Sequence, residues 1–301
     1  MKVFKIVEKY KVWFSISLTV MLIGFGLGVS RVFNNEPMLN YGIDFVGGSS
    51  IMVKIGESQS TSTIELIQNV RQSLEKIGLN KVSIQVTQDK EVIIKTTHLK
   101  TNGISLIQDQ LKRDFRKVEV LEVDYIGPSF GNELRSKSIL ILAIVSATLM
   151  IYISWRFQFS FGVAALMALL HDGLITISAA SILNIEIDSA FVAALLTVLG
   201  YSINDTIIIF DRIRENMKTI TDQSINAITN LSIKQSLSRT FNTSITSLLA
   251  VSSLALFGGS TIREFCIILL IGISSGIYST MFIASPTFAM LENRNQNKIS
   301  T

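Results

Sequence analysis

The chain has 301 residues, 48% of them hydrophobic, and a mean hydropathy of +0.45. A soluble domain of this length normally carries less apolar material, so the composition predicts a membrane protein. The formal net charge of +4 does not suggest nucleic-acid binding, because the basic residues lie beside apolar segments. The single cysteine, Cys266, lies in an apolar run and excludes an intrachain disulfide.

Several apolar segments are long enough to cross a bilayer, whose hydrocarbon core of about 30 Å needs about 20 apolar residues in a helix. In chain order they are 13–30, 138–155, 159–183, 189–210, 240–262 and 265–291. The first follows a basic start, but it exceeds the roughly 7–15 apolar residues of a secretory signal, so we expect it to be retained. The sequence predicts a polytopic α-helical membrane protein with six transmembrane helices.

Lys and Arg residues gather at one end of the predicted helices. Twelve of them fall in segments that would share one side of the membrane: 1–12, 156–158, 211–239 and 292–301. The short loops on the opposite side hold only Arg263. Basic residues near helix ends remain in the cytoplasm on insertion, so both termini are expected to be cytoplasmic.

This orientation divides the chain into four parts. They are a cytoplasmic N-terminus with helix 1 (1–33), an extracytoplasmic domain (34–135), helices 2–6 with a cytoplasmic loop at 211–239 (136–291), and a cytoplasmic tail (292–301). The expected location is a bacterial cytoplasmic (inner) membrane.

The extracytoplasmic segment alternates strand and helix patterns. The expected elements are strand 49–55, a helix from 62 to about 77, strands 82–87 and 91–97, a helix near 102–115, and strand 117–125. Ser62 and Glu65 form a capping-box pattern at the start of the first helix. The β-α-β-β-α-β order is typical of a ferredoxin-like α+β domain. The segment has no catalytic-triad or metal-site pattern, and His98 is expected to be a surface loop residue.

Ionisable residues interrupt the apolar segments at His171, Asp172 and Asp205. A carboxylate near the centre of a membrane helix costs about 2.5–3.5 kcal/mol, so its presence needs a reason. Asp205 precedes the polar residue Asp211 by six positions, about 9 Å along a helix. Arg239 can lie at the same depth, where it could pair with Asp205 and lose its partner when Asp205 takes a proton.

Less specific interpretations of these residues remain open. Asp205 and Arg239 could be helix-end residues that reach water, as the positive-inside rule expects of Arg239. His171 and Asp172 could carry protons or could only bind a neighbouring helix. An intramembrane aspartyl protease is disfavoured, because those enzymes have a Gly-x-Gly-Asp pattern that the residues before Asp205 lack. No catalytic residue, metal site or cofactor is predicted.

A glycine-rich motif follows the first apolar segment. Gly42, Gly47 and Gly48 permit tight backbone geometry where the chain leaves the membrane and enters a strand. Asp44 could cap or bridge this junction, a structural role that we prefer to one in transport.

Several motifs occur in a fixed order along the chain. They are GIDFVGG at 42–48, GPSFGNEL at 127–134, His171-Asp172, GYSINDT at 200–206, FDRIREN at 210–216, Ser238-Arg239-Thr240 and the Gly258-Gly259 turn. This set resembles the SecD/SecF family of protein-export membrane proteins, within the RND superfamily, over nearly the whole chain. Six helices and one outside domain are half of the twelve-helix RND arrangement, so the resemblance implies a partner half.

The resemblance implies that the protein acts with SecD and the SecYEG channel complex to promote export of preproteins. The energy would come from the proton-motive force or a sodium gradient, with Asp205 and Arg239 at ion-coupling positions and His171 and Asp172 as further candidates. Two alternatives are half of an RND-type exporter of lipids or small molecules, for which the outside domain is small, and a passive structural subunit.

Overall fold

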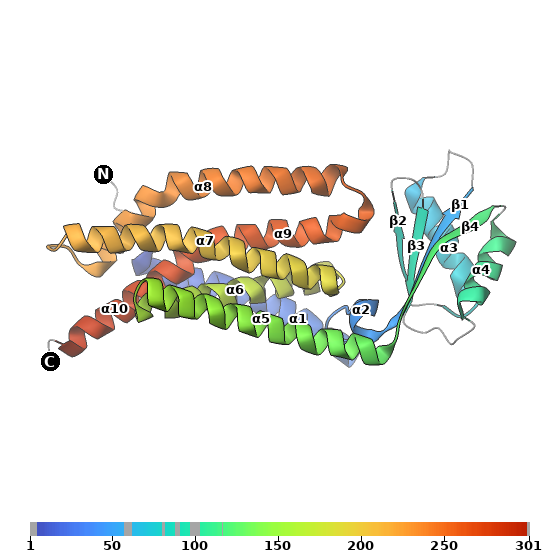
Figure 1. Cartoon of the computed structure of the whole chain (residues 1–301), viewed down its shortest axis with the longest axis horizontal. Helices are drawn as coiled ribbons and strands as arrows, with labels where there is room; N and C mark the ends of the chain where they lie inside the picture. The colour runs from blue at the N-terminus through green and yellow to red at the C-terminus, as the bar shows by residue number, and fades with distance from the viewer. Residues whose placement is uncertain are drawn as a thin grey trace.

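The molecule consists of a bundle of long helices and a smaller α/β domain at one end of the bundle (Figure 1). The computed structural model describes residues 5–56, 62–79, 82–87, 91–96, 103–115 and 117–299. Within these residues six helical spans are long and apolar enough to cross a membrane. The chain is therefore a multi-pass membrane protein, as its composition predicts.

The spanning helices differ in how much of their surface the bundle covers. They are α1 (Tyr10–Phe33), α5 (Pro128–Arg156), α6 (Phe159–Leu183), α7 (Ser189–Thr219), α8 (Ile225–Phe257) and a sixth span built from α9 (Ser260–Ser279), the π-helical segment η2 (Thr280–Ala284) and α10 (Ser285–Ile299). A short 3-10 turn, η1 (Val7–Lys9), precedes α1. About half or more of the apolar part of α6, α7 and the sixth span is buried, whereas α1, α5 and α8 are mostly exposed.

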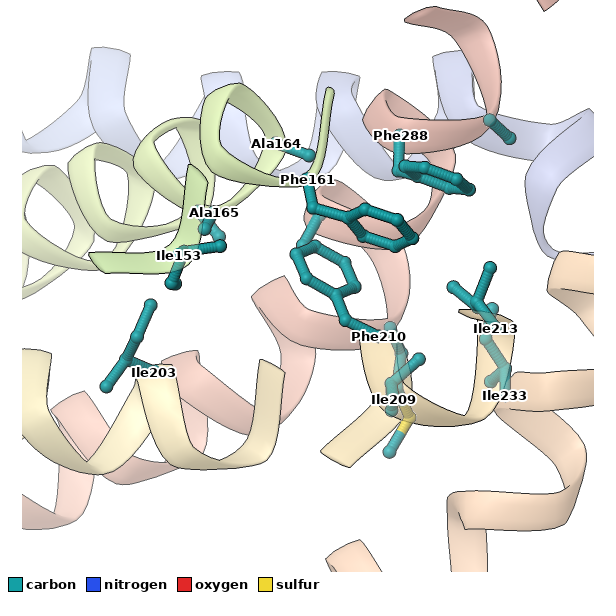
Figure 2. Close-up of a cluster of buried hydrophobic side chains, with 14 of the residues drawn as sticks. Ile153, Phe161, Ala164, Ala165, Ile203, Ile209, Phe210, Ile213, Ile233 and Phe288 are labelled. Atoms are coloured by element: carbon teal, nitrogen blue, oxygen red, sulfur yellow. The ribbon is translucent and has the colours of Figure 1, made fainter. Parts of the chain in front are cut away.

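Aromatic side chains fill the centre of the bundle at one end. Phe161 of α6 stacks on Phe288 of α10 with ring centroids 4.0 Å apart, and Phe210 of α7 lies 4.8 Å from Phe161. Figure 2 shows these three rings converging, with aliphatic side chains around them. All three are fully or almost fully buried, so they fix the spacing of three helices.

The segment 211–239, expected to be a cytoplasmic loop that forms either a solvated connector or an amphipathic helix, is mostly helical. Helix α7 continues to Thr219 and α8 begins at Ile225, so only residues 220–224 connect them. Two side-chain bonds hold the helices together beyond their apolar parts: Asn216 Nδ2 donates to Ser232 Oγ at 2.8 Å, and Arg212 Nε to Gln235 Oε1 at 2.6 Å. The loss of hydropathy after residue 210 therefore marks the end of an apolar run and not the end of the helix.

The α/β domain is a four-stranded antiparallel sheet in the order β2-β3-β1-β4. Its elements are β1 (Gly48–Ile55), α3 (Thr63–Glu75), β2 (Val82–Val86), β3 (Glu91–Thr96), α4 (Gly103–Asp114) and β4 (Val118–Ile126). The Ser62 hydroxyl accepts from the Glu65 amide at 3.2 Å, which confirms the predicted helix cap. The predicted loop residue His98 lies outside the described residues.

One face of the sheet packs on α3 and α4 (Figure 1). Ile51 and Val53 of β1 are fully buried there, together with Val70 of α3 and Leu111 of α4. Because side chains alternate along a strand, the intervening residues of β1 point to the opposite face. That second face is turned toward the membrane helices, since two of these intervening residues, Ser50 and Met52, line a cavity with α7 and α9.

The chain passes between the two parts through a glycine-rich junction that includes a short helix, α2 (Ile43–Val46). Gly47 has a φ of +80°, a left-handed conformation that favours glycine, and a Cβ at this position would lie 2.8 Å from Pro128. A Cβ on Gly48 would lie 2.5 Å from the carbonyl oxygen of Thr96. Asp44 bridges this junction to α7, because its carboxylate accepts from the backbone amide of Ser189 at 3.1 Å and from the Ser189 hydroxyl.

Candidate functional site

Asp172 lies in α6 and is fully buried. Its Oδ1 accepts from the Ser275 hydroxyl at 2.6 Å, and its Oδ2 accepts from the hydroxyls of Ser202 at 2.6 Å and Ser279 at 2.7 Å. The Nδ1 atom of His171 lies 3.0 Å from Oδ1. A buried carboxylate is tolerated when its oxygens are hydrogen-bonded, and here the partners come from α6, α7 and α9.

His171 extends this network to α1. Its Nε2 lies 2.8 Å from the hydroxyl of Ser17, and its ring stacks on Tyr278 with centroids 5.8 Å apart. The Tyr278 hydroxyl donates to the carbonyl oxygen of Trp13 at 2.7 Å. The two residues that the sequence singled out at 171 and 172 therefore form one buried unit that joins four helices.

Asp205 lies in α7 and is also fully buried, but its surroundings are poorer in hydrogen bonds. Its Oδ2 accepts from the Ser244 hydroxyl of α8 at 3.1 Å. Its Oδ1 is buried and has no hydrogen-bond partner in the described part of the chain. An unsatisfied buried carboxylate oxygen is costly, and such exceptions in a native structure often accompany function or an unseen ion or water.

Arg239 does not pair with Asp205 in this conformation, since no ion pair joins these two described residues and the Arg239 side chain is exposed. On helix α8, Thr240 and Ser244 are four residues apart, and both point into the bundle. Arg239 precedes Thr240 by one residue, a rotation of about 100° that directs it outward. It also lies five residues before Ser244, about 7.5 Å along the helix axis.

The exposed side of α8 carries a polar stripe at helical spacing. Its members, all exposed, are Arg239, Asn242, Thr243 and Thr246. The neighbouring helix α7 exposes Thr197, Gly200 and Asn204, and its Tyr201 hydroxyl donates to the carbonyl oxygen of Thr243 at 3.1 Å. Polar residues are costly against lipid, and small residues allow close helix packing, so this face is suited to another protein or to water.

The π-helical segment η2 lies between the two carboxylate sites. Ser279, the residue before it, donates to Asp172, and Thr280, its first residue, lies 2.9 Å from the Thr206 hydroxyl beside Asp205. The Ser285 hydroxyl donates to the carbonyl oxygen of Thr280 at 2.8 Å. Single π-helical turns inside α-helices are frequent at functional sites.

The sequence indicated the carboxylates but missed the hydroxyl groups that surround them. The missed groups belong to Ser244, Ser275 and Ser279. Each is a common residue in an apolar helix, and only the four-residue spacing of Ser275 and Ser279, or of Thr240 and Ser244, gives a signal that they share a helix face. Within the described ranges no group of His, Cys, Asp and Glu could hold a metal ion.

Buried carboxylates among hydroxyl groups, inside a bundle of membrane-spanning helices, are typical of the class of membrane transport proteins. A family model described as "Protein export membrane protein SecD/SecF, C-terminal" matches residues 106–294, more than half of the chain. The chain belongs to this SecD/SecF family.

Relatives of known name agree with this assignment. The protein translocase subunit SecF of Synechocystis sp. is 34% identical over 285 residues, which cover 92% of this chain and 90% of the relative. The protein translocase subunit SecF of Rickettsia felis is 35% identical over 295 residues, which cover 96% of this chain and 92% of the relative. These similarities support a role in protein export.

Solved structures of SecDF have the same fold over this chain. The translocon-associated membrane protein SecDF from Thermus thermophilus superposes with a TM-score of 0.80 at 30% identity, and the match covers 95% of this chain and 38% of that one. SecDF in a super-membrane-facing form gives a TM-score of 0.73 at 30% identity, covering 100% and 40%. The chain therefore spans less than half the length of the SecDF chains that it matches.

Proposed function

We propose that this protein acts with SecD and the SecYEG channel complex to promote the export of preproteins, using the proton- or sodium-motive force. The observation that carries the proposal is the carboxylate of Asp205, which is fully buried in α7 and has one oxygen without a partner among the described residues. Such an oxygen is free to accept a proton or to coordinate a cation. The other oxygen is held by Ser244, so the group is positioned as well as reactive.

A change of charge at Asp205 would change the hydrogen bonds that α7 and α8 form with each other. The buried Thr240 hydroxyl, one helical turn before Ser244, has no partner in the described residues and could accept from a protonated Asp205 after a small movement. A charge that crosses the whole membrane potential gains about 2.3 kcal/mol per 100 mV. That energy is large enough to shift a two-state equilibrium between helix arrangements.

The Asp172 unit is the second part of the proposed coupling site. Ser202 and Ser279 bind Asp172, while Thr206 and Thr280, the next hydroxyl groups along α7 and η2, contact each other beside Asp205. A shift of α7 against η2 would therefore change the hydrogen bonds of both carboxylates. In this proposal a change of charge at Asp205 moves α7, and this movement changes the hydrogen bonds of His171 and Asp172.

The polar stripe on α8 supports a partner half supplied by SecD. Arg239 is a cation on the exposed side of a membrane helix, and in a bilayer it needs an acidic or polar partner. In the proposed complex the stripe packs against SecD, which provides that partner. Arg239 then acts in ion coupling at the interface between the halves and not through the direct pair with Asp205.

We place the protein in a bacterial cytoplasmic membrane with both termini in the cytoplasm. Support comes from the twelve basic residues on one side against the single Arg263 on the other. Segment 34–135 then lies outside. The observed strand order, with α3 and α4 on one face, supports a ferredoxin-like assignment for this domain.

The test is preprotein export in cells whose only copy carries Asp205→Asn. We expect export driven by the ion gradient to fall while the variant and SecD remain assembled in the membrane. Asp211→Asn is the matched control, because Asp211 lies on the same helix and is exposed. Normal export with Asp205→Asn would refute the coupling role and favour a passive structural subunit.

A further inference from the structure

The α/β domain is attached to the membrane helices at one corner. Gly48, the first residue of β1, pairs with Ile126, the last residue of β4, so the two covalent connections lie side by side. Gly47 and Gly127 flank these two residues, and Gly47 approaches Pro128 closely. Two adjacent connections rich in glycine have the properties of a hinge, about which a rigid sheet can rotate.

The surface beneath the sheet is held rigidly to the membrane helices. Residues 184–188 connect α6 to α7, and within them the Ile187 amide donates to the carbonyl oxygen of Asn40 at 2.7 Å. The Gly42 amide donates to the carbonyl oxygen of Ile187 at 3.0 Å. Asp188 caps α7 by accepting from the Phe191 amide at 2.8 Å. Glu186 therefore projects from a fixed backbone.

A cavity of about 270 Å³ separates the open face of the sheet from this surface. Met52 and Ile93 line it from the sheet, and Phe191 and Phe265 line it from α7 and α9. The apolar residues on the two sides are thus separated by the cavity at this place. Hydrophobic packing here contributes less to holding the domain down than a closed core would.

An ion pair crosses between the two sides of this cavity. Lys95 Nζ of β3 lies 3.0 Å from Glu186 Oε2, and their side chains are only 22% and 11% exposed. Burial opposes the charge on Lys95, but the carboxylate of Glu186 and its hydrogen bond, with more distant acidic groups, outweigh burial and raise the pKa of Lys95. The amine therefore remains charged at neutral pH.

Lys95 is the one cation among the described residues that line the cavity. The acidic residues that line it are Glu122 and Asp124 on the sheet side and Glu186, Asp188 and Glu264 on the membrane side. Without Lys95, carboxylates on the two sides would face one another across the cavity, and like charges repel. Among the described lining residues, Lys95 therefore supplies the attraction between charged groups of the two sides, through its ion pair with Glu186.

We propose that the Lys95–Glu186 ion pair is a latch, which holds the α/β domain against the membrane helices and whose opening lets the domain swing on the hinge at 47–48 and 126–127. The existence of this latch is independent of the proposed function. Only its use during export rests on that function. The moving side carries Lys95, and the fixed side carries Glu186.

The latch is tested by a distance measurement on the full chain in lipid nanodiscs. Spin labels are placed on Glu75→Cys in α3 and Leu183→Cys at the end of α6, both exposed, in a Cys266→Ser background. We expect Lys95→Glu to shift the distance distribution to longer and broader values. Adding Glu186→Lys should restore the original distribution, since the ion pair is rebuilt with its charges exchanged.

Lys54→Glu is the matched control, because Lys54 is exposed, lies on the same face of the sheet as Ser50 and makes the same charge change away from the cavity. It should leave the distribution unchanged. A Lys95→Glu distribution equal to that of the unmodified chain, or an equal shift with Lys54→Glu, would overturn the latch. The readout is a distance and not export, so it stands independently of whether Asp205 couples ions.

Discussion

Asp172 and Asp205 are both fully buried carboxylates, yet they differ in how their oxygens are satisfied. In the described parts of the chain, Asp172 accepts from three serine hydroxyls and contacts His171, whereas Asp205 accepts only from Ser244. The carboxylate of Asp172 therefore contributes to holding the helices together, whereas the carboxylate of Asp205 can still accept a further hydrogen bond or a proton. Substitutions that remove the charge but keep the shape should separate these two roles.

We expect Asp172→Asn to lower the melting temperature of the detergent-solubilised chain, and Asp205→Asn to leave it nearly unchanged. An asparagine at 172 would place amide hydrogens against hydroxyl donors, and a lost bond to a buried charged group costs about 1–3 kcal/mol. Asp205→Asn breaks few bonds, because one carboxylate oxygen has no partner within the ranges that the structure describes. Equal losses in the two variants would contradict the assignment of different roles.

Arg239 illustrates how much of the candidate site could be predicted from the sequence. The sequence indicated Asp205 and Arg239 as candidate site residues that could lie at the same depth, whereas Arg239 lies about 7.5 Å along α8 from Ser244, the residue that contacts Asp205. The sequence could not give the rotation of α8, and one residue changes that rotation by about 100°. The partner of Asp205 is thus Ser244, a residue type whose presence in an apolar helix carries no charge signal.

At the scale of elements, the sequence pattern predicted the strands and helices of the α/β domain more accurately than the helical structure of segment 211–239. Strand 49–55 is confirmed as β1, and the helix that begins after Ser62 is confirmed as α3. These elements are half-buried, so their apolar periods reflect their structure directly. The ends of α7 and α8 within 211–239 bury polar residues such as Asn216 and Ser232 together with apolar ones, so their apolar period is weaker, and side-chain hydrogen bonds join the two helices.

The contact between α3 and α4 should depend on pH. The hydrogen bond from Lys76, aided by one from Gln110, lowers the pKa of Asp114 to about 2. Because the folded pKa lies below the usual value of 3.8, the pair stabilises the fold above pH 3.8 and this contribution is lost as the pH falls toward 2. Asp114→Asn should therefore reduce hydrogen-exchange protection of α3 and α4 at pH 5 but not near pH 2.

The control for this measurement is Asp109→Asn, which changes an exposed carboxylate on the same helix. It should leave the protection of α3 and α4 close to that of the unmodified chain at both pH values. Loss of protection in Asp114→Asn that persists unchanged near pH 2 would show that the lost carboxylate acts through packing and not through its charge.

At the scale of the whole molecule, the outer surface of the helical bundle is uneven. Helices α1 and α5 expose large apolar side chains such as Leu22 and Ile151, as lipid requires. The stripe on α8 is polar in contrast, and it adjoins the small and polar residues of α7. This difference predicts which side of the bundle meets another protein.

We expect Thr246→Cys on α8, in a Cys266→Ser background, to cross-link to co-expressed SecD with a short bifunctional reagent. The matched control is Leu22→Cys on α1, which is exposed on a purely apolar surface and should not cross-link. Gel mobility of the chain and its partner gives the readout. Cross-linking from α1 and not from α8 would place the partner on the opposite side and contradict the proposed interface.

The adjacency of β1 and β4 also affects how the chain is made. Because Gly48 and Ile126 are paired, the two ends of the α/β domain lie side by side. The distance that the domain must span between α1 and α5 is therefore as short as that of a tight hairpin. The domain is thus an insertion whose ends are close together, and such insertions can fold on one side of a membrane while the helices pack within it. Domains of other sizes could occupy this place during evolution without any change in the helices below.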